Sequence, residues 1–400
     1  MRTRRPISEK TIIFTESVVL SLLCLSFFLF RTEPGQAAMA HAGKAAAALG
    51  LEKMLPQKQE NATPPEAKSY IKWVDFTVTC EAMNQAFRYD VDTCQADVHL
   101  NWVDLLAYLG ARYGGDFSRY KAADMTQVAE KLKSGETTME ALTKDMKYYK
   151  YYREAYGAVL DGMVGQFEAQ IPASEAPGAY LPSGVTGGAP GDPETIWVTK
   201  YGLKAFSPIA KGFPYSDFDD FGVARSYGFR RQHLGHDLMG QVGTPVIAVE
   251  SGYVEAMGWN QYGGWRLGIR SFDKKRYYYY AHLRKDYPYQ SNLKEGSYVQ
   301  AGDVIGYLGR TGYSRTENTN NIDEPHLHFG LQLIFDESQK EGNNEIWVSC
   351  YELVKFLSMN RSQAVKVEGT KEWTRVYGTK DPQVPDTPPA EPPKAPESNP

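Results

Sequence analysis

Residues 195–366 are divided into short β-like runs that glycines separate. The runs include TPVIAVESGYVEAMG, WRLGIRSF, RYYYYAHL, GDVIGYLG and HLHFGLQLIF. Closely spaced runs of β-branched and aromatic residues, without helical segments between them, are typical of antiparallel sheets. We therefore predict a C-terminal, all-β antiparallel domain over 195–366, with a short terminal helix in VSCYELVKFL.

Residues 70–168 have helical periodicity instead. NWVDLLAYLGARYGG has apolar residues at i, i+3 and i+4 and ends in two glycines, and ADMTQVAEKLKSG repeats this pattern. Thr137 and Glu140 have the spacing of a capping box, which predicts a long helix over 138–166. The region is interpreted as an α-helical middle domain. It contains no catalytic constellation, and the lone His99 is expected to be structural.

Three other segments cannot build a core of their own. Residues 32–69 are rich in Ala, Gly, Pro, Lys and Glu and are predicted to be a linker. Residues 169–194 are dense in Pro and Gly and are predicted to be a second linker. Residues 367–400 are predicted to be a Pro-rich, disordered tail. In a chain of 400 residues this pattern indicates a multidomain protein.

The N-terminus carries the signals of export. Four basic side chains within the first ten residues precede TIIFTESVVLSLLCLSFFLF, which is about one bilayer span long although Glu16 interrupts its start. The sequence AMA at 38–40 resembles a signal-peptidase site but lies far from the apolar run. We therefore favour an uncleaved anchor in residues 1–31 over a cleaved signal. It would be a single transmembrane helix that places the rest of the chain outside the cytoplasm.

Charge and cysteine content limit the partners. The formal net charge of −4 argues against a nucleic-acid partner. The spacing of Cys80 and Cys94 fits neither a CxxC redox motif nor a zinc knuckle. In an exported domain these two residues either form a disulfide or remain free thiols.

Five of the seven histidines lie in the β region, within RQHLGHDLMG, YYYYAHL and PHLHFG. If HLHFGLQLIF is a strand, His326 and His328 project from one face about 6–7 Å apart. Such a pair alone also fits two structural histidines. In HLGHD, however, Gly235 allows the backbone to bring His233 and Asp237 together.

Two histidines and an aspartate form a ligand set that suits Zn²⁺, and three protein ligands leave the fourth position open for water. The sequence has no HExxH motif, so a glutamate base on a helix is not available. Histidines would have to move the protons instead. The candidates are His282 and the histidine of the HxH pair that does not bind the metal.

These motifs resemble the M23 metallopeptidases, the lysostaphin-like or LytM-type cell-wall endopeptidases. The resemblance covers about residues 195–345. It includes H-x-x-x-D at His233 and Asp237, H-x-H at His326 and His328, and Tyr-x-His ending at His282. It also includes the flanking GTPVIAVESGYV and VQAGDVIGYLGRTGYS.

The resemblance implies a groove on a β-sheet with one Zn²⁺ per chain, bound by His233, Asp237 and His328. It implies that His282 and His326 are catalytic, activating the zinc-bound water and stabilising the tetrahedral oxyanion. Family members cut peptide bonds in peptidoglycan stems or cross-bridges. The implied protein is a membrane-anchored peptidoglycan endopeptidase. The helical region resembles segments that accompany this peptidase in Gram-positive bacteria, which implies such an origin.

Two features depart from the family pattern. The inserted RTENTNNIDE separates TGYS from Pro325 and is predicted to form a loop at the rim of the groove. His236 has no role in the pattern and is expected to be solvated or to lie next to the metal ligands. The alternative function is a non-catalytic M23-like scaffold or activator in cell division or sporulation. Degenerate members lose ligands, whereas this sequence keeps all five positions.

Overall fold

The computed structural model of the chain describes residues 70–175, 195–226 and 230–385. Tyr70–Pro400 form one compact unit. The predicted anchor at 1–31 and the linker at 32–69 lie outside the described residues, as do 176–194 of the second linker and 386–400 of the tail. In the part of the chain that is described, no helix is both long and apolar enough to cross a membrane.

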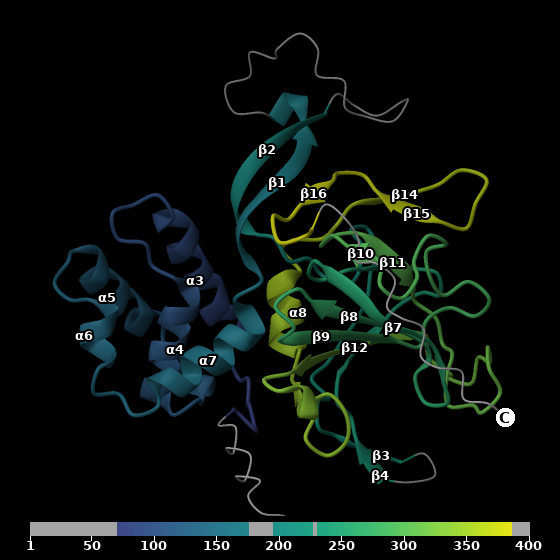
Figure 1. Ribbon diagram of the computed structural model, residues 1–400, viewed down its shortest axis with the longest axis horizontal. Coiled ribbons are helices and arrows are strands. Elements are labelled where there is room, and N and C mark those ends of the chain that lie inside the picture. The colour runs from purple at the N-terminus through teal and green to yellow at the C-terminus, as the bar shows by residue number, and fades with distance from the viewer. Residues whose placement is uncertain (1–69, 176–194, 227–229, 386–400) are drawn as a thin grey trace, which may run out of the picture. The chain divides into compact units, whose positions relative to one another are not determined.

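Within residues 70–175, five α-helices precede the β region, in agreement with the predicted helical region (Figure 1). They are α3 (Cys80–Thr93), α4 (Trp102–Tyr113), α5 (Ala122–Lys133), α6 (Met139–Thr143) and α7 (Tyr149–Leu160). Asn101 begins α4 as its N-cap, because its side chain accepts hydrogen bonds from the backbone N–H groups of Val103 and Asp104. The apolar stripe of α4, including Leu105 and Leu109, is fully buried in the helical core.

The predicted long helix over 138–166 is wrong. Helix α6 ends at Thr143, α7 begins at Tyr149, and Val164 begins strand β1 (Val164–Pro172). The N-cap of α6 is Thr138, whose hydroxyl accepts from the Ala141 N–H. Strand β1 pairs along its whole length with β2 (Thr195–Leu203), and this non-local pairing overrides the local pattern that predicted a helix.

A disulfide between Cys80 and Cys94 does not form in this structure, and both thiols are free and half-buried. Cys80 is the first residue of α3, and Cys94 is its C-cap. A helix rises 1.5 Å per residue, so the two Cα atoms are about 20 Å apart, whereas a disulfide requires less than about 7 Å.

The β region contains a seven-stranded sheet whose pairings are all antiparallel, which confirms the predicted antiparallel β character. Its strands lie in the order β10, β7, β8, β9, β12, β13, and β5 also pairs with β12. Their bounds are β5 (His236–Met239), β7 (Gly252–Asn260), β8 (Gly264–Ser271), β9 (Arg276–Ala281), β10 (Tyr298–Val299), β12 (His326–Leu333) and β13 (Ile346–Val348).

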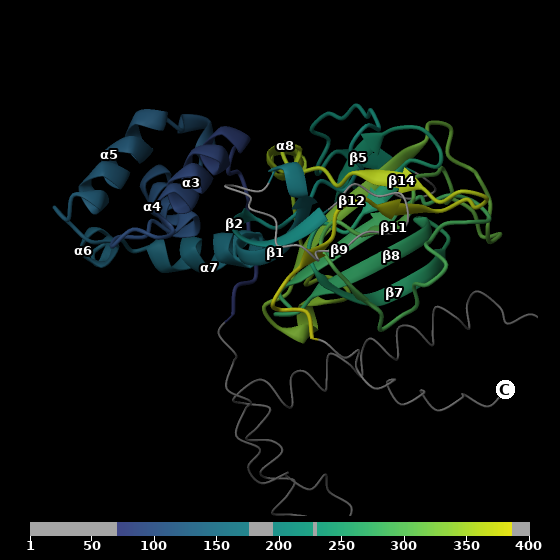
Figure 2. The same cartoon turned by 90° about the horizontal axis from the view of Figure 1, so that it is seen from above.

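The predicted terminal helix is present as α8 (Tyr351–Leu357), and it lies between the helices and the sheet (Figures 1 and 2). Phe356 stacks on Trp102 of α4 with ring centroids 5.6 Å apart and packs edge-on against Phe87 of α3. The helical region and the sheet therefore share one apolar core around α8.

Short strands complete the fold. They are β3 (Ala224–Ser226), β4 (Arg230–Gln232), β6 (Pro245–Ile247), β11 (Val304–Tyr307), β14 (Ala364–Lys366), β15 (Trp373–Arg375) and β16 (Thr379–Lys380). Strand β3 pairs with β4, β6 with β11, β14 with β15, and β16 joins β1. Strands β15 and β16 lie in the segment assigned to the disordered tail, so the described part of that segment is ordered up to at least Lys380.

Candidate metal centre

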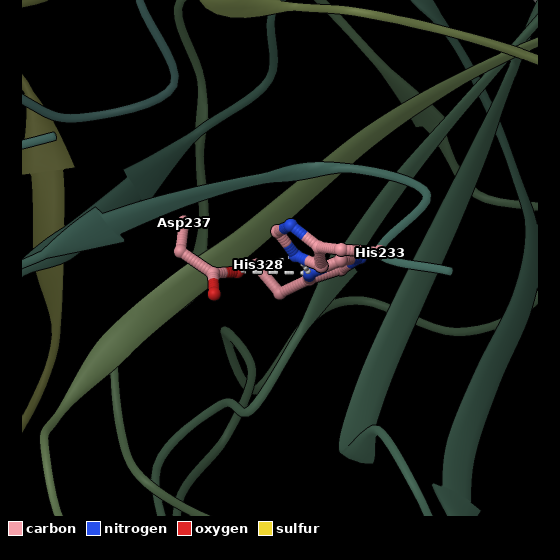
Figure 3. A group of neighbouring side chains, drawn as sticks. All are labelled: His233, Asp237 and His328. Atoms are coloured by element: carbon pink, nitrogen blue, oxygen red, sulfur yellow. Dashed lines mark hydrogen bonds and ion pairs between the residues drawn. The ribbon is translucent and has the colours of Figure 1, made fainter. Parts of the chain in front are cut away.

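The pairing of β5 with β12 assembles the centre. In this antiparallel pair, His328 lies directly opposite Asp237. His233 comes from the segment between β4 and β5, and its imidazole reaches the same point (Figure 3). Gly235 makes room for this arrangement, because a Cβ at that position would come within 2.5 Å of the His328 ring. The predicted H-x-x-x-D and H-x-H motifs therefore meet through one strand register.

Three ligand atoms converge. Nε2 of His233 lies 3.1 Å from Oδ1 of Asp237 and 2.9 Å from Nδ1 of His328, and that Nδ1 lies 2.9 Å from the same Oδ1 (Figure 3). In a tetrahedral zinc site with bonds of 2.0–2.1 Å, ligand atoms lie about 3.3 Å apart. The three residues form a metal-binding group, and its spacing is slightly tighter than in an occupied zinc site.

The hydrogen-bond pattern around His233 also fits a bound cation. Its Nδ1 lies 3.1 Å from Oδ2 of Asp220, a carboxylate oxygen that only accepts, so the ring proton is placed on Nδ1. Nε2 then presents a lone pair to the carboxylate oxygen of Asp237. Two acceptors facing each other at 3.1 Å repel unless a positive charge lies between them. The donor set therefore fits Zn²⁺, which accepts both N and O ligands.

Asp220 and Arg225 were not found from the sequence. Asp220 is buried and orients His233, and the Arg225 guanidinium hydrogen-bonds to the Asp220 carboxylate. Arg225 also lies 2.8 Å from Oδ2 of Asp237, which leaves Oδ1 of Asp237 directed at the histidines. Carboxylates that orient ligand histidines are common around metal sites. No sequence motif marks Asp220, which is 13 residues from its partner.

His282 and His326 lie beside the metal-binding group. Their ring centroids are 4.8 Å apart, and the His282 centroid is 5.8 Å from that of His328. Nδ1 of His282 lies 2.9 Å from the Thr311 carbonyl, and Nδ1 of His326 lies 2.8 Å from the Glu324 carbonyl. Because a carbonyl only accepts, both Nδ1 atoms carry the proton, and each Nε2 is left with a lone pair.

The backbone of His282 is in the left-handed region, with φ of 61°. This conformation is uncommon for a residue other than glycine and is typical of functional sites. It ends β9 and turns the ring toward His326 and His328. The backbone N–H donates to the Gly263 carbonyl at 2.8 Å, which fixes the turn.

Burial and charge shift the pKa values of the centre. Burial and the neighbouring histidines hold the pKa of His282 well below its usual value. Burial also lowers the pKa of His328, although Asp237 opposes that shift. Burial disfavours the charged form of Asp237, but the adjacent imidazoles of His233 and His328 outweigh burial and hold its pKa far below its usual range. The centre thus contains an ionised carboxylate, and burial favours the neutral forms of His282 and His328. Ionised carboxylates and neutral imidazoles are the forms that bind a metal ion.

The centre opens into a groove of about 640 Å³. Its floor is the face of the sheet that carries Tyr277, Tyr279 and Ala281 of β9, and His282 and His328 lie in its wall. The inserted residues 315–324 form a loop, as predicted. Tyr313, just before the insertion, lines the groove, whereas Asn318 accepts hydrogen bonds from Trp265 and from the backbone of Asp286.

One expectation about a nearby residue needs correction. His236 is not solvated, because it is 1% exposed and bonds to Asp217 at 2.8 Å on the other side of β5 from the centre. Tyr280, part of the Tyr-x-His element, is fully buried, and its hydroxyl accepts from the Val249 N–H. His99 is structural, as expected, because it pairs with the buried Asp90.

Residues 231–341 match Peptidase family M23. The L-Ala--D-Glu endopeptidase of Bacillus subtilis (strain 168) is 40% identical over 124 residues, which are 31% of this chain and 36% of that protein. Lysostaphin of Staphylococcus simulans is 41% identical over 98 residues, 24% of this chain and 17% of that protein. The crystal structure of a candidate glycyl-glycine endopeptidase lytM from Ruminococcus gnavus ATCC 29149 covers 75% of this chain and 95% of its own, at 21% identity and a TM-score of 0.47.

The match to these two relatives covers only part of each of them. The aligned segment spans about a third of the Bacillus protein and less than a fifth of lysostaphin. Residues 231–341, which match the family, contain all three members of the metal-binding group as well as His282 and His326. Residues 231–341 are therefore an M23 peptidase domain, and the helices at 80–160 lie outside the matched segment.

Proposed function

We propose that the M23 peptidase domain of this chain is a zinc-dependent endopeptidase that hydrolyses peptide bonds in the stems or cross-bridges of peptidoglycan. The observation that carries the proposal is the convergence of two groups at one end of an open groove. Three ligand atoms lie within 2.9–3.1 Å of one another, and two further histidines with fixed tautomers stand beside them. The similar L-Ala--D-Glu endopeptidase of Bacillus subtilis supports the substrate, as does a peptidoglycan DD-endopeptidase of Vibrio cholerae that is 33% identical over 131 residues.

One Zn²⁺ per chain would be held by Nε2 of His233, Oδ1 of Asp237 and Nδ1 of His328. When bound there, zinc supplies a Lewis acid that polarises a carbonyl group and lowers the pKa of water to about 7. Asp220 keeps the His233 proton on Nδ1, and Arg225 keeps Asp237 oriented. These two residues hold the ligand set in place.

His282 and His326 would move the protons. The Thr311 carbonyl fixes the Nδ1 proton of His282, so its Nε2 can accept a proton from the attacking water and then donate it to the leaving amine. The Glu324 carbonyl fixes His326 in the same way. With a proton on Nε2, either ring stabilises the negative oxygen that develops on the scissile carbonyl.

We also propose that residues 1–31 anchor the protein in the cell membrane with the peptidase domain outside the cytoplasm. The basic N-terminus followed by a single apolar run supports this topology. Protease added to intact, wall-stripped cells should digest the β region. Full protection of that region would overturn both the topology and the access to peptidoglycan.

Digestion of purified sacculi tests the activity. The full-length, zinc-loaded protein should release peptides whose new termini, identified by mass spectrometry, name the bond that is cut. The matched control is His328→Ala, which should lose zinc and peptide release together. A non-catalytic scaffold predicts a folded protein with one zinc per chain and no released peptide, and that result would refute the proposed enzyme.

A further inference from the structure

The floor of the groove contains an arginine, Arg266, near the metal centre. Leu267 pairs with Tyr280 between β8 and β9, and both side chains are buried in the core. Because side chains alternate along a strand, Arg266 and Ala281 face the opposite side, which is the groove. His328 pairs with Ala281 on the next strand. Arg266 is therefore in the same cross-strand row as the ligand His328, two strands away.

Arg266 differs from other arginines of the sheet in having no carboxylate partner among the described residues. Arg270 and Arg276 each form ion pairs with glutamates, and Arg225 bridges the two aspartates of the metal centre. By contrast, Nε of Arg266 is buried and has no hydrogen-bond partner in the described structure. A guanidinium that is partly removed from water without an anion is costly.

The neighbours of Arg266 are tyrosines. The hydroxyl end of Tyr277 lies over Gly268, where a Cβ would come within 1.9 Å of that oxygen, so only glycine allows this ring position. Tyr277 and Tyr279 line the groove next to Arg266. The surroundings therefore position the guanidinium without neutralising it, and they leave room in the groove for an anion.

The other cations of the groove are already engaged. Nζ of Lys340 lies 2.8 Å from Oε1 of Glu255. The Arg231 guanidinium lies against the rings of Tyr262 and Tyr313 and hydrogen-bonds to the hydroxyl of Tyr313. Among the described residues, Arg266 is thus the cation of the groove that has no such partner and can bind a carboxylate of a ligand.

We propose that Arg266 binds a carboxylate of the substrate, so that the groove selects acidic peptides over neutral ones. The proposal rests on the proposed function, because it takes the groove to be the place where the peptide lies. Arginine suits this role because its planar fork holds a carboxylate with two parallel hydrogen bonds. An oligoglycine bridge has no such group, whereas a stem peptide with a free glutamyl carboxylate does.

The register sets where that carboxylate lies along the substrate. Two strand spacings of about 4.8 Å separate Arg266 from His328, or about 10 Å at the backbone. An extended peptide spans about 3.3–3.6 Å per residue. The recognised carboxylate therefore lies within about three residues of the scissile bond.

Binding of two matched peptides tests the inference. One is a synthetic Ala-γ-D-Glu-Lys peptide with the glutamyl α-carboxylate free, and the other is the same peptide with that carboxylate amidated. Calorimetry on the zinc-loaded, full-length His282→Ala protein measures affinity without turnover. We expect the free acid to bind about 10- to 100-fold more tightly, as for a hydrogen bond between charged groups. Adding Arg266→Gln should reduce the ratio to about one and leave the affinity for the amide unchanged.

Three controls make the result specific. Lys340→Gln removes an equal charge from the same groove and should keep the preference for the acid. Arg266→Lys keeps the charge without the fork and should give an intermediate ratio. Zinc content and thermal unfolding of Arg266→Gln should match those of the parent protein.

The outcomes separate this inference from the proposed enzyme. A preference for the acid that survives Arg266→Gln means that the carboxylate binds elsewhere, for example at the metal, and overturns the inference. Equal loss in Lys340→Gln shows a general charge effect and also overturns it, as does failure of both peptides to bind. Hydrolysis of sacculi by the wild type without any preference for the acid refutes the inference alone. A preference that depends on Arg266, without hydrolysis by the wild type, refutes the enzyme alone.

Discussion

The two faces of strand β9 differ in how their polar groups are paired. On the core face, Arg276 is 1% exposed and makes two hydrogen bonds to Glu250, at 2.7 and 3.1 Å, and a third to the Ala158 carbonyl of α7. Tyr278 donates to the same glutamate. On the groove face, the strand ends at Ala281, and the ring centroid of the next residue, His282, lies 5.8 Å from that of His328.

Burial of charged groups therefore does not distinguish the groove face of β9 from its core face. The core-face residues are as buried as the ligands of the metal centre, but their donors and acceptors match one another. On the groove face, the Nε2 lone pair of His233 faces a carboxylate oxygen of Asp237. Arg266 has no anionic partner within the described structure. Polar groups without a matching partner, rather than buried polar groups, therefore distinguish a ligand-binding site from a structural ion pair.

The largest expected effect comes from the groove face. His282→Ala should lower turnover by about 10²–10⁴-fold, because it removes a positioned proton-transfer group. It should still retain close to one zinc per chain, since His282 is not among the ligands. Metal analysis and sacculus hydrolysis on the same sample measure both quantities. Loss of zinc would make His282 a fourth ligand, and near-normal turnover would make it a packing residue.

On the core face, Glu250→Gln should change stability and not chemistry. It leaves the buried Arg276 without its bidentate partner, and breaking a buried pair of this kind costs about 3–5 kcal/mol in the free energy of unfolding. Chemical denaturation measures the loss, and Glu368→Gln at an exposed position is the matched control. Turnover per folded molecule should stay at the wild-type level. A selective fall in turnover would contradict the division between the two faces.

Asp220→Ala should have a smaller effect that is specific to the metal. Removing the carboxylate leaves the His233 Nδ1 proton only the Asp220 backbone carbonyl, at 3.2 Å, so the ring is held less firmly, which typically lowers metal affinity about 10- to 100-fold. Competition with a zinc chelator measures the affinity, and Asp219→Ala, at the exposed neighbouring residue, should leave it unchanged. Equal affinities in the two variants would show that Asp220 only packs against the histidine.

The sequence predicted the parts of the site that depend on local geometry. Alternation along a strand is enough to place His326 and His328 on one face, and the glycine between His233 and Asp237 allows that turn to close. The positions of Asp220 and Arg225 depend on the segment that leads into β3, which carries no motif and hydrogen-bonds to the backbone of His233. The helix predicted over 138–166 failed for the same reason, because β1 is determined by its pairing with β2. Local patterns therefore grouped the candidate side chains, and the family resemblance selected His328 over His326 as the ligand, whereas non-local pairings position the residues around them.

The smallest expected effect is the difference between removing one or the other of two hydroxyl groups, which belong to neighbouring residues of β9. The Tyr280 hydroxyl accepts from the buried Val249 N–H at 3.1 Å, so Tyr280→Phe leaves that donor unsatisfied and should cost about 1–3 kcal/mol of stability. Tyr279→Phe removes a hydroxyl from the groove face, next to Asn260, and should leave stability within about 0.5 kcal/mol. Thermal or denaturant unfolding gives the first quantity, and kcat/KM on sacculus fragments should change only for Tyr279→Phe. If Tyr280→Phe lowered kcat/KM while Tyr279→Phe destabilised the fold, the tyrosine of the Tyr-x-His element would act from the core face, and the separation of the two faces would be wrong.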